Sequence, residues 1–178
     1  TTASLAQRGT VPTQEEIDRL CKAKCDLFAT YPETPRMPGA LELVQQVKSG
    51  GLTPMIVTGS GTPTLLNRIQ ENFPSLFEPN HIITSFNVKR GKPYPDPYLL
   101  ALERGGFRPD EAIVVENAPL GVQAGVAAGM FTIAVNTGPL KDEVLSEAGA
   151  SLIYSSMPTL SKEWTTLHKA LLTFGRKA

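Results

Sequence analysis

Residues 112–119 read Ala-Ile-Val-Val-Glu-Asn-Ala-Pro, and this stretch decides the fold. Its β-branched first half predicts a buried strand, because near-continuous apolar strands occur where both faces of a sheet are covered. Two oxygen-bearing side chains, Glu116 and Asn117, follow directly, and Pro119 suits the first position of a helix. A strand, a polar turn and a helix in this order are typical of an α/β protein with a doubly wound parallel sheet.

The same alternation continues on both sides of this stretch. We therefore expect an α/β domain over residues 37–178, built from short apolar strands that alternate with helices. The expected strands are 55–57, 82–83, 112–115, 132–135 and 152–153, and the expected helices are 41–47, 65–69, 98–102, 120–128 and 160–171.

A different pattern occupies the first 36 residues. Thr13 and Glu16 have the spacing of a capping box, and apolar residues recur behind them at helical intervals. Prolines at 32, 35 and 38 prevent the helix from continuing. The sequence therefore predicts a domain boundary between Arg36 and Met37.

The two cysteines of the chain, Cys21 and Cys25, lie four residues apart and so share one face of the predicted helix. A zinc site needs two further ligands, and the histidines, His81 and His168, have no ligand-like spacing. We expect buried thiols rather than a metal site, and no role for either histidine.

Composition excludes some partners. The 17 basic and 17 acidic residues give a formal net charge of zero, so no field steers the protein toward nucleic acid or an anionic membrane. No apolar run reaches the length of about 20 residues that spans a bilayer, and no signal-peptide pattern is present. We expect a cytoplasmic protein, and nothing in the pattern indicates an oligomeric state.

Polar residues follow three of the predicted strands, where ligands bind in open parallel sheets. Thr58, Gly59 and Ser60 form a turn that can hold phosphate or serve only as a turn. Lys92 follows the second strand and can neutralise phosphate or be a surface charge. Glu116 and Asn117 suit Mg²⁺, or Asn117 caps the next helix.

Thr58, Lys92 and Glu116 follow one another along the chain, and each lies in a polar stretch after a predicted strand. Lys92 stands within Gly91-Lys92-Pro93, and Pro95-Asp96-Pro97 follows at the start of a predicted helix. This arrangement resembles the haloacid dehalogenase (HAD) superfamily of hydrolases, and in particular the β-phosphoglucomutase-like phosphatases. The resemblance implies that residues 1–36 belong to a helical cap domain and residues 37–178 to the catalytic core.

The resemblance also implies a Mg²⁺-dependent phosphatase that acts on a small phosphorylated metabolite or on pyrophosphate. Thr58, Gly59, Ser60 and Lys92 would bind the phosphoryl group, with Thr58 and Lys92 in catalytic roles, and Glu116 and Asn117 would hold Mg²⁺. Asn117 replaces the commoner Asp of the family, and Ala118 replaces a frequent Ser.

The nucleophile of this family is an aspartate in an Asp-x-Asp pair after the first strand, and it forms an aspartyl phosphate. No Asp-x-Asp occurs in the 178 residues, and the chain begins at Thr1 rather than at methionine. We expect the strand that carries the nucleophile to lie upstream and the printed chain to be inactive.

Two alternatives remain at this stage. One is a non-catalytic remnant or fragment with the same fold. The other is a dinucleotide-binding oxidoreductase, which the turn at 57–61 suggests, although Thr64 stands where the third glycine of that fingerprint belongs.

Overall fold

The structure is a computed structural model that describes residues 11–31 and 35–175. It divides into two compact units, Thr1–Pro35 and Arg36–Ala178, so the division falls in the proline-rich stretch. Residues 1–10 of the predicted cap portion lie outside the described residues. The assignment of the first unit to a cap domain stays a prediction.

The first unit contains one described helix, α2 (Gln14–Ala29). The predicted capping box is confirmed, because the Thr13 N–H donates to Glu16 at 2.9 Å and the Glu16 N–H donates to Thr13 Oγ1 at 3.2 Å. The expectation of buried thiols is wrong, since Cys21 and Cys25 are both exposed. Within this unit the structure describes no second element against which that helix face could be buried.

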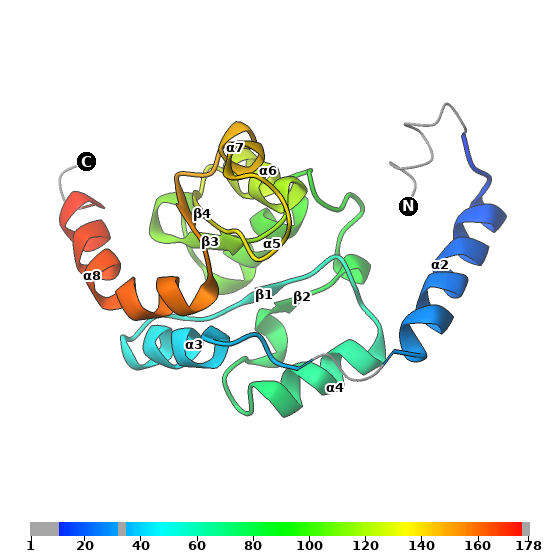
Figure 1. The fold of residues 1–178 in the computed structure, drawn as a ribbon, viewed down its shortest axis with the longest axis horizontal. Coiled ribbons are helices and arrows are strands. Elements are labelled where there is room, and N and C mark those ends of the chain that lie inside the picture. The colour runs from blue at the N-terminus through cyan, green and yellow to red at the C-terminus, as the bar shows by residue number, and fades with distance from the viewer. Residues whose placement is uncertain (1–10, 32–34, 176–178) are drawn as a thin grey trace. The chain divides into compact units, whose positions relative to one another are not determined.

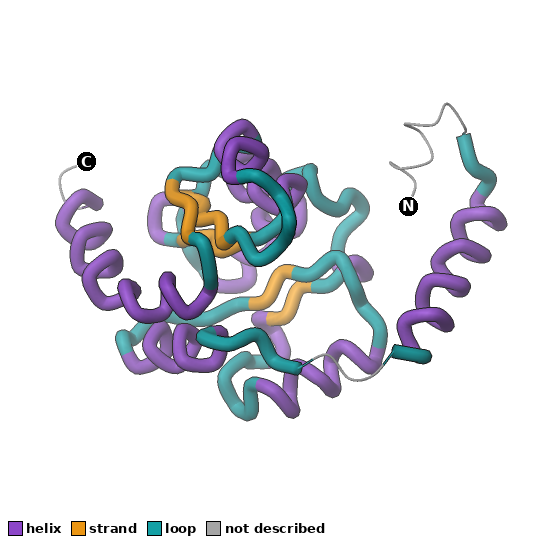
Figure 2. Tube along the Cα trace, viewed as in Figure 1, coloured by secondary structure: helices purple, strands orange, loops and turns teal. Residues whose placement is uncertain are grey.

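The strands of the second unit form two parallel sheets (Figure 2). In the first sheet β1 (Ile56–Val57) pairs with β2 (Ile82–Ile83). In the second sheet β4 (Phe131–Val135) lies between β3 (Ile113–Glu116) and β5 (Leu152–Tyr154). All five strands lie within a few residues of their predicted positions.

Six helices connect or flank these strands in the described part of the second unit (Figure 1). Short 3-10 turns precede β2 and β3 and follow β2, and neither these turns nor α7 was expected from the sequence. The helices are α3 (Ala40–Ser49), α4 (Pro63–Asn72), α5 (Asp96–Gly105), α6 (Pro119–Ala127), α7 (Asp142–Glu147) and α8 (Met157–Gly175), and the turns are η1 (Pro79–His81), η2 (Ser85–Asn87) and η3 (Pro109–Glu111).

Helices cover both faces of the three-stranded sheet, as the apolar strands predicted. Along β4, Ile133 and Val135 pack with Leu43 of α3 and with Leu160 and Trp164 of α8. Between them Ala134 faces the opposite way and packs with Val122 of α6 and Leu145 of α7. This alternation confirms the doubly wound arrangement, since successive strand residues point to opposite faces.

The two sheets do not join into one. Among the described residues, β1 pairs only with β2, and β3 pairs only with β4. A cavity of about 1160 Å³, lined mostly by apolar side chains, is bounded by residues of both β1 and β3, among them Val57 and Val114. Val115 is 37% exposed although it lies in a core strand. The edges of β1 and β3 therefore border an apolar groove.

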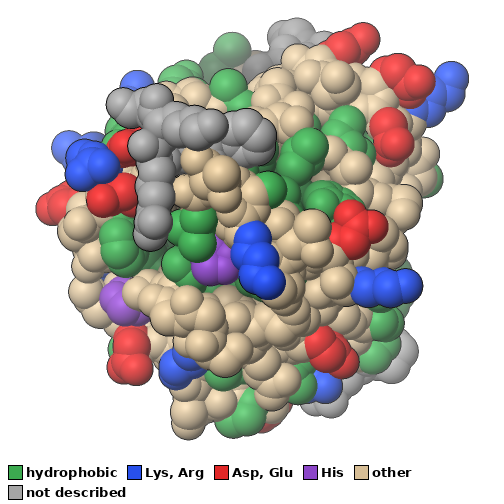
Figure 3. Space-filling model, turned by 90° about the vertical axis from the view of Figure 1, so that its left-hand side faces the viewer, with side chains coloured by type: hydrophobic (Ala, Val, Ile, Leu, Met, Phe, Trp, Pro, Cys, Tyr) green, Lys and Arg blue, Asp and Glu red, His purple; other side chains and the backbone are tan. Residues whose placement is uncertain are grey.

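On the face shown in Figure 3, acidic and basic side chains are interspersed around apolar ones. In the described ranges, no helix has both the length and the apolar character that a membrane span requires.

Candidate functional site

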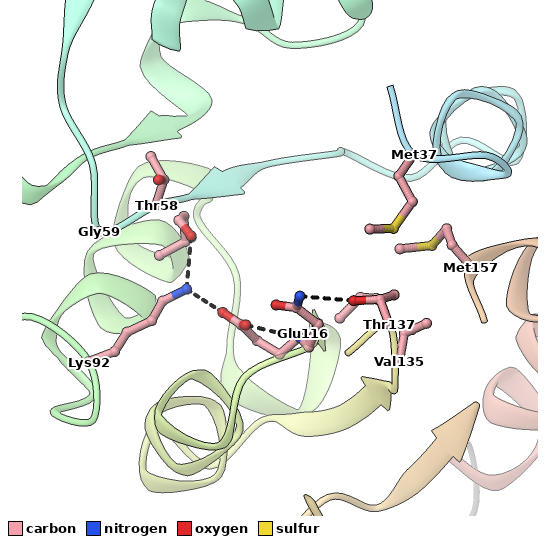
Figure 4. Close-up of a pocket in the computed structure, with 11 residues that line it drawn as sticks. Met37, Thr58, Gly59, Lys92, Glu116, Val135, Thr137 and Met157 are labelled. Atoms are coloured by element: carbon pink, nitrogen blue, oxygen red, sulfur yellow. Dashed lines mark hydrogen bonds and ion pairs between the residues drawn. The ribbon is translucent and has the colours of Figure 1, made fainter. Parts of the chain in front are cut away.

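The carboxyl ends of β1, β3 and β4 meet at a cavity of about 410 Å³ (Figure 4). Thr58, Lys92 and Glu116 all line this cavity, so the predicted convergence of these three side chains is confirmed. The full lining is Met37, Val57, Thr58, Gly59, Lys92, Val115, Glu116, Asn117, Val135, Thr137 and Met157.

The turn after β1 is held by one hydrogen bond to β2 and one to the side chain of Thr58. The Thr58 N–H donates to Ile83 O at 2.9 Å, and the Ser60 N–H donates to Thr58 Oγ1 at 3.1 Å. Gly59 also lines the cavity, and no atom lies within 4 Å of the place where a side chain would begin. Ser60 is exposed and does not line the cavity, so the structure brings Thr58 and Gly59 to the site without it.

Lys92 connects the two sheets. Its Nζ donates to Val57 O, at the end of β1, at 2.9 Å, and it forms an ion pair with Glu116, at the end of β3. Only 18% of the Lys92 side chain and 11% of the Glu116 side chain are exposed. Removing one partner of such a mostly buried ion pair would leave the other charge poorly solvated by water. Each partner therefore holds the other in place.

The Glu116 carboxylate has a second donor in the buried side chain of Tyr98. The Tyr98 hydroxyl donates to Glu116 Oε1 at 2.6 Å, and the Lys92 ammonium lies 5.0 Å from the centre of the Tyr98 ring. Burial, followed by the negative charge of Glu116 and its hydrogen bond, raises the pKa of Tyr98. The hydroxyl therefore keeps its proton and acts as a donor.

Asn117 makes a contact that its two predicted roles did not include. Its Nδ2 donates to Thr137 Oγ1, just beyond β4, at 3.0 Å. The N-cap of α6 is Ala118, with no side-chain capping bond, so the alternative role of Asn117 as the cap is wrong. The amide nitrogen is occupied by Thr137, which leaves Oδ1 as the atom that could meet a cation.

The donor atoms at this edge fit part of a Mg²⁺ site. Glu116 supplies a carboxylate and Asn117 an amide oxygen, and Mg²⁺ prefers such oxygen ligands together with several waters. Nowhere in the described ranges do three His, Cys, Asp or Glu side chains gather into a metal-binding group. These two residues would therefore supply only part of the coordination shell.

Sequence reasoning missed four contributors to the site. Met37 and Met157 lie beside each other at one side of the cavity in Figure 4. Thr137 follows the carboxyl end of β4, so the strand-end rule could have found it. Gly121 leaves room for Glu116, because a Cβ at Gly121 would come within 2.4 Å of all three atoms of the carboxylate. Neither the methionines nor this close approach has a recognisable sequence signal.

Fold and site together define an α/β protein whose polar residues gather at the carboxyl ends of parallel strands. The chain belongs to the haloacid dehalogenase-like hydrolase family, which it matches over residues 3–129. This membership favours a hydrolase over the dinucleotide-binding alternative.

Two similar curated proteins are phosphatases. Hexitol phosphatase A of Escherichia coli K12 is 38% identical over 127 residues, which are 71% of this chain and 57% of that protein. Validoxylamine A 7'-phosphate phosphatase of Streptomyces hygroscopicus subsp. limoneus is 32% identical over 139 residues, which are 76% of this chain and 64% of that protein. The chain thus spans less than two thirds of the length of either phosphatase.

Among solved structures, a candidate beta-phosphoglucomutase from Bacteroides vulgatus is similar over most of the chain. The TM-score is 0.89 and the identity 57%, and the match covers 94% of this chain and 68% of that one. The structural similarity supports the β-phosphoglucomutase-like branch of the family.

Proposed function

We propose that the protein containing this chain is a Mg²⁺-dependent phosphatase that acts on a small phosphorylated metabolite or on pyrophosphate. The observation that carries the proposal is the convergence of Thr58, Lys92 and Glu116 on one cavity at the carboxyl ends of β1 and β3. The phosphatases among the relatives support this reaction class.

Each residue has a role that its position supports. The Thr58 hydroxyl and the Gly59 N–H would bind phosphoryl oxygens, whereas the Ser60 N–H donates to Thr58 Oγ1 and Ser60 does not line the cavity. Lys92 would offset the negative charge on the phosphoryl group, and Glu116 and Asn117 would hold Mg²⁺. The ion, when bound, stabilises the charge that develops on the transferring group.

The nucleophile in this proposal comes from outside the 178 residues. All five aspartates of the chain lie in helical elements: Asp18 and Asp26 in α2, Asp96 in α5, Asp110 in η3 and Asp142 in α7. A strand lying in the groove between β1 and β3 would end at the same edge as Thr58 and Glu116. An aspartate at that end would therefore be next to Lys92.

In the proposed reaction an oxygen of that aspartate bonds to phosphorus while the bond from phosphorus to the leaving oxygen breaks. The leaving oxygen takes a proton, and water then hydrolyses the aspartyl phosphate to release inorganic phosphate. Since no described carboxylate other than Glu116 lines the cavity, we expect the 178-residue chain by itself to be inactive.

Phosphate release from a panel of phosphomonoesters and pyrophosphate, with and without Mg²⁺, tests the proposal. The 178-residue chain is compared with the same chain extended upstream by its encoded sequence. We expect turnover only in the extended protein and only with Mg²⁺. Turnover by a chain that mass spectrometry shows to begin at Thr1 would contradict the assignment of the nucleophile, and metal-independent turnover would contradict the role of Mg²⁺.

A further inference from the structure

The described part of the second unit contains a buried tyrosine whose hydroxyl the proposed reaction does not use. Tyr98 lies in the first turns of α5 and is only 5% exposed. Its side chain packs in the core cluster with Leu102, Val114 and Ala124. This packing restrains the ring, and its hydroxyl donates to Glu116, which lines the site.

The two oxygens of the Glu116 carboxylate have different surroundings. Oε1 accepts from the Tyr98 hydroxyl at 2.6 Å and also from Lys92. Oε2 accepts only the Asn117 backbone N–H, at 3.2 Å, among the contacts found in the described ranges. Gly121 lies against the whole carboxylate, since a Cβ there would come within 2.4 Å of both oxygens. Oε1 is thus saturated by two donors, while Oε2 keeps the capacity for a cation.

Lys92 by itself is a poor anchor for this orientation. A lysine ammonium is a point charge on a flexible stem, and Lys92 divides its donors between Glu116 and Val57 O. In the proposed reaction it would also serve the phosphoryl group. Tyr98 has no such second duty, because its single hydroxyl proton is committed to Glu116.

We infer that Tyr98 is a positioning residue that holds Glu116 Oε1, so that Oε2 is presented to Mg²⁺. The inference rests on the proposed Mg²⁺ site. It goes beyond that site because it assigns to each carboxylate oxygen a separate task and to α5 a part in metal binding. Partners that orient metal ligands contribute strongly to affinity even though they never touch the ion.

The test is a Mg²⁺ titration by isothermal calorimetry of the chain extended upstream by its encoded sequence, called the unmodified chain below, and of its Tyr98→Phe variant. Phenylalanine keeps the ring and removes only the hydroxyl. We expect the Kd for Mg²⁺ to rise about 10-fold or more. Tyr154→Phe is the matched control, because Tyr154 also has a carboxylate partner, Glu163, at a place outside the cavity lining. Its Kd should equal that of the unmodified chain.

The outcomes separate the inference from the proposed function. Equal Mg²⁺ affinities of the unmodified chain and Tyr98→Phe would overturn the inference and leave the Mg²⁺ site standing. No Mg²⁺ binding by the unmodified chain would overturn the metal site and the inference with it. A fall in affinity in Tyr154→Phe equal to that in Tyr98→Phe would also overturn the inference, since the effect would not be specific to Glu116.

A second measurement needs no substitution and so does not depend on a variant that folds. In the unmodified chain labelled with ¹³C at tyrosine Cζ, Mg²⁺ should shift the Tyr98 resonance, because the cation draws charge from its hydrogen-bonded carboxylate. The Tyr154 resonance should stay in place. A Tyr98 signal that does not move at saturating Mg²⁺ would contradict the inference.

Discussion

The two sheets of the second unit differ in how they are held. The three-stranded sheet has fully buried residues, with Ile133 and Val135 at 0% exposure, and helices on both faces. The two-stranded sheet has two residues in each strand; Ile83 of β2 is also fully buried, but both residues of β1 are only half-buried. A two-stranded sheet is marginal without further support. Stability therefore resides mainly in one sheet, whereas the site needs both.

The site is built across this division. Thr58 and Gly59 follow the smaller sheet, and Glu116 and Asn117 follow the larger one. Lys92 bonds to the last residue of β1 and to the last residue of β3. The residues proposed to bind phosphate and those proposed to bind metal thus come from different sheets, and the distance between them depends on contacts between the two sheets.

The largest effect should come from the centre of the larger sheet. Ile133→Ala removes a side chain with 0% exposure and should lower the free energy of unfolding by about 4 kcal/mol. Ile56→Ala, in half-buried β1, should cost roughly half as much. Urea unfolding measures both. Equal losses would contradict the view that the larger sheet carries most of the stability.

The second largest effect should come from replacing Lys92, which bonds to both sheets. In a form of the protein that hydrolyses a phosphomonoester, Lys92→Ala should lower kcat by about 100-fold or more, as removal of one transition-state donor does. Lys89→Ala, which changes an exposed lysine of the same loop, is the control and should leave kcat unchanged. A normal kcat in the Lys92→Ala variant would contradict a role for Lys92 in the reaction.

A smaller loss should follow Gly121→Ala. The added Cβ would lie 2.2 Å from Glu116 Cδ, so the carboxylate must move away from its bonds to Tyr98 and Lys92. We expect about 1–3 kcal/mol of destabilisation, the usual cost of overpacking, together with weaker Mg²⁺ binding. Gly138→Ala is the matched control, because nothing lies within 4 Å of a Cβ there. Thermal unfolding with and without Mg²⁺ compares the two variants.

Asn117→Asp should have the smallest effect. Unlike Gly121→Ala, it should strengthen Mg²⁺ binding. A second carboxylate beside Glu116 should tighten Mg²⁺ binding several-fold and slightly destabilise the metal-free protein through repulsion of like charges. Asn67→Asp, on the exposed face of α4, adds the same charge away from the site and should leave Mg²⁺ binding unchanged. Calorimetric titration of both variants gives the comparison, and unchanged affinity in Asn117→Asp would argue against Asn117 as a ligand.

Much of this arrangement could be predicted from the sequence because it depends on local patterns. The apolar run before Glu116 predicted β3, and the strand-end rule predicted that Thr58 and Lys92 lie close to Glu116. The contacts of Tyr98 and Asn117 could not be predicted, because they depend on how α5 and β4 pack against β3. The exposure of Cys21 could not be predicted either, since helical spacing shows which residues share a face but not whether anything covers it.

The stacking of Trp164 on His168 has a practical consequence. Trp164 is the only tryptophan of the chain, it is 5% exposed, and its ring lies nearly parallel to that of His168 at a centroid distance of 5.8 Å. It packs against Ile133 and Val135, so its intrinsic fluorescence reports on the larger sheet. Unfolding of β1 and β2 would leave this emission largely unchanged and would show only in circular dichroism. A difference between the two optical transitions would therefore reveal whether the two sheets unfold together or one after the other.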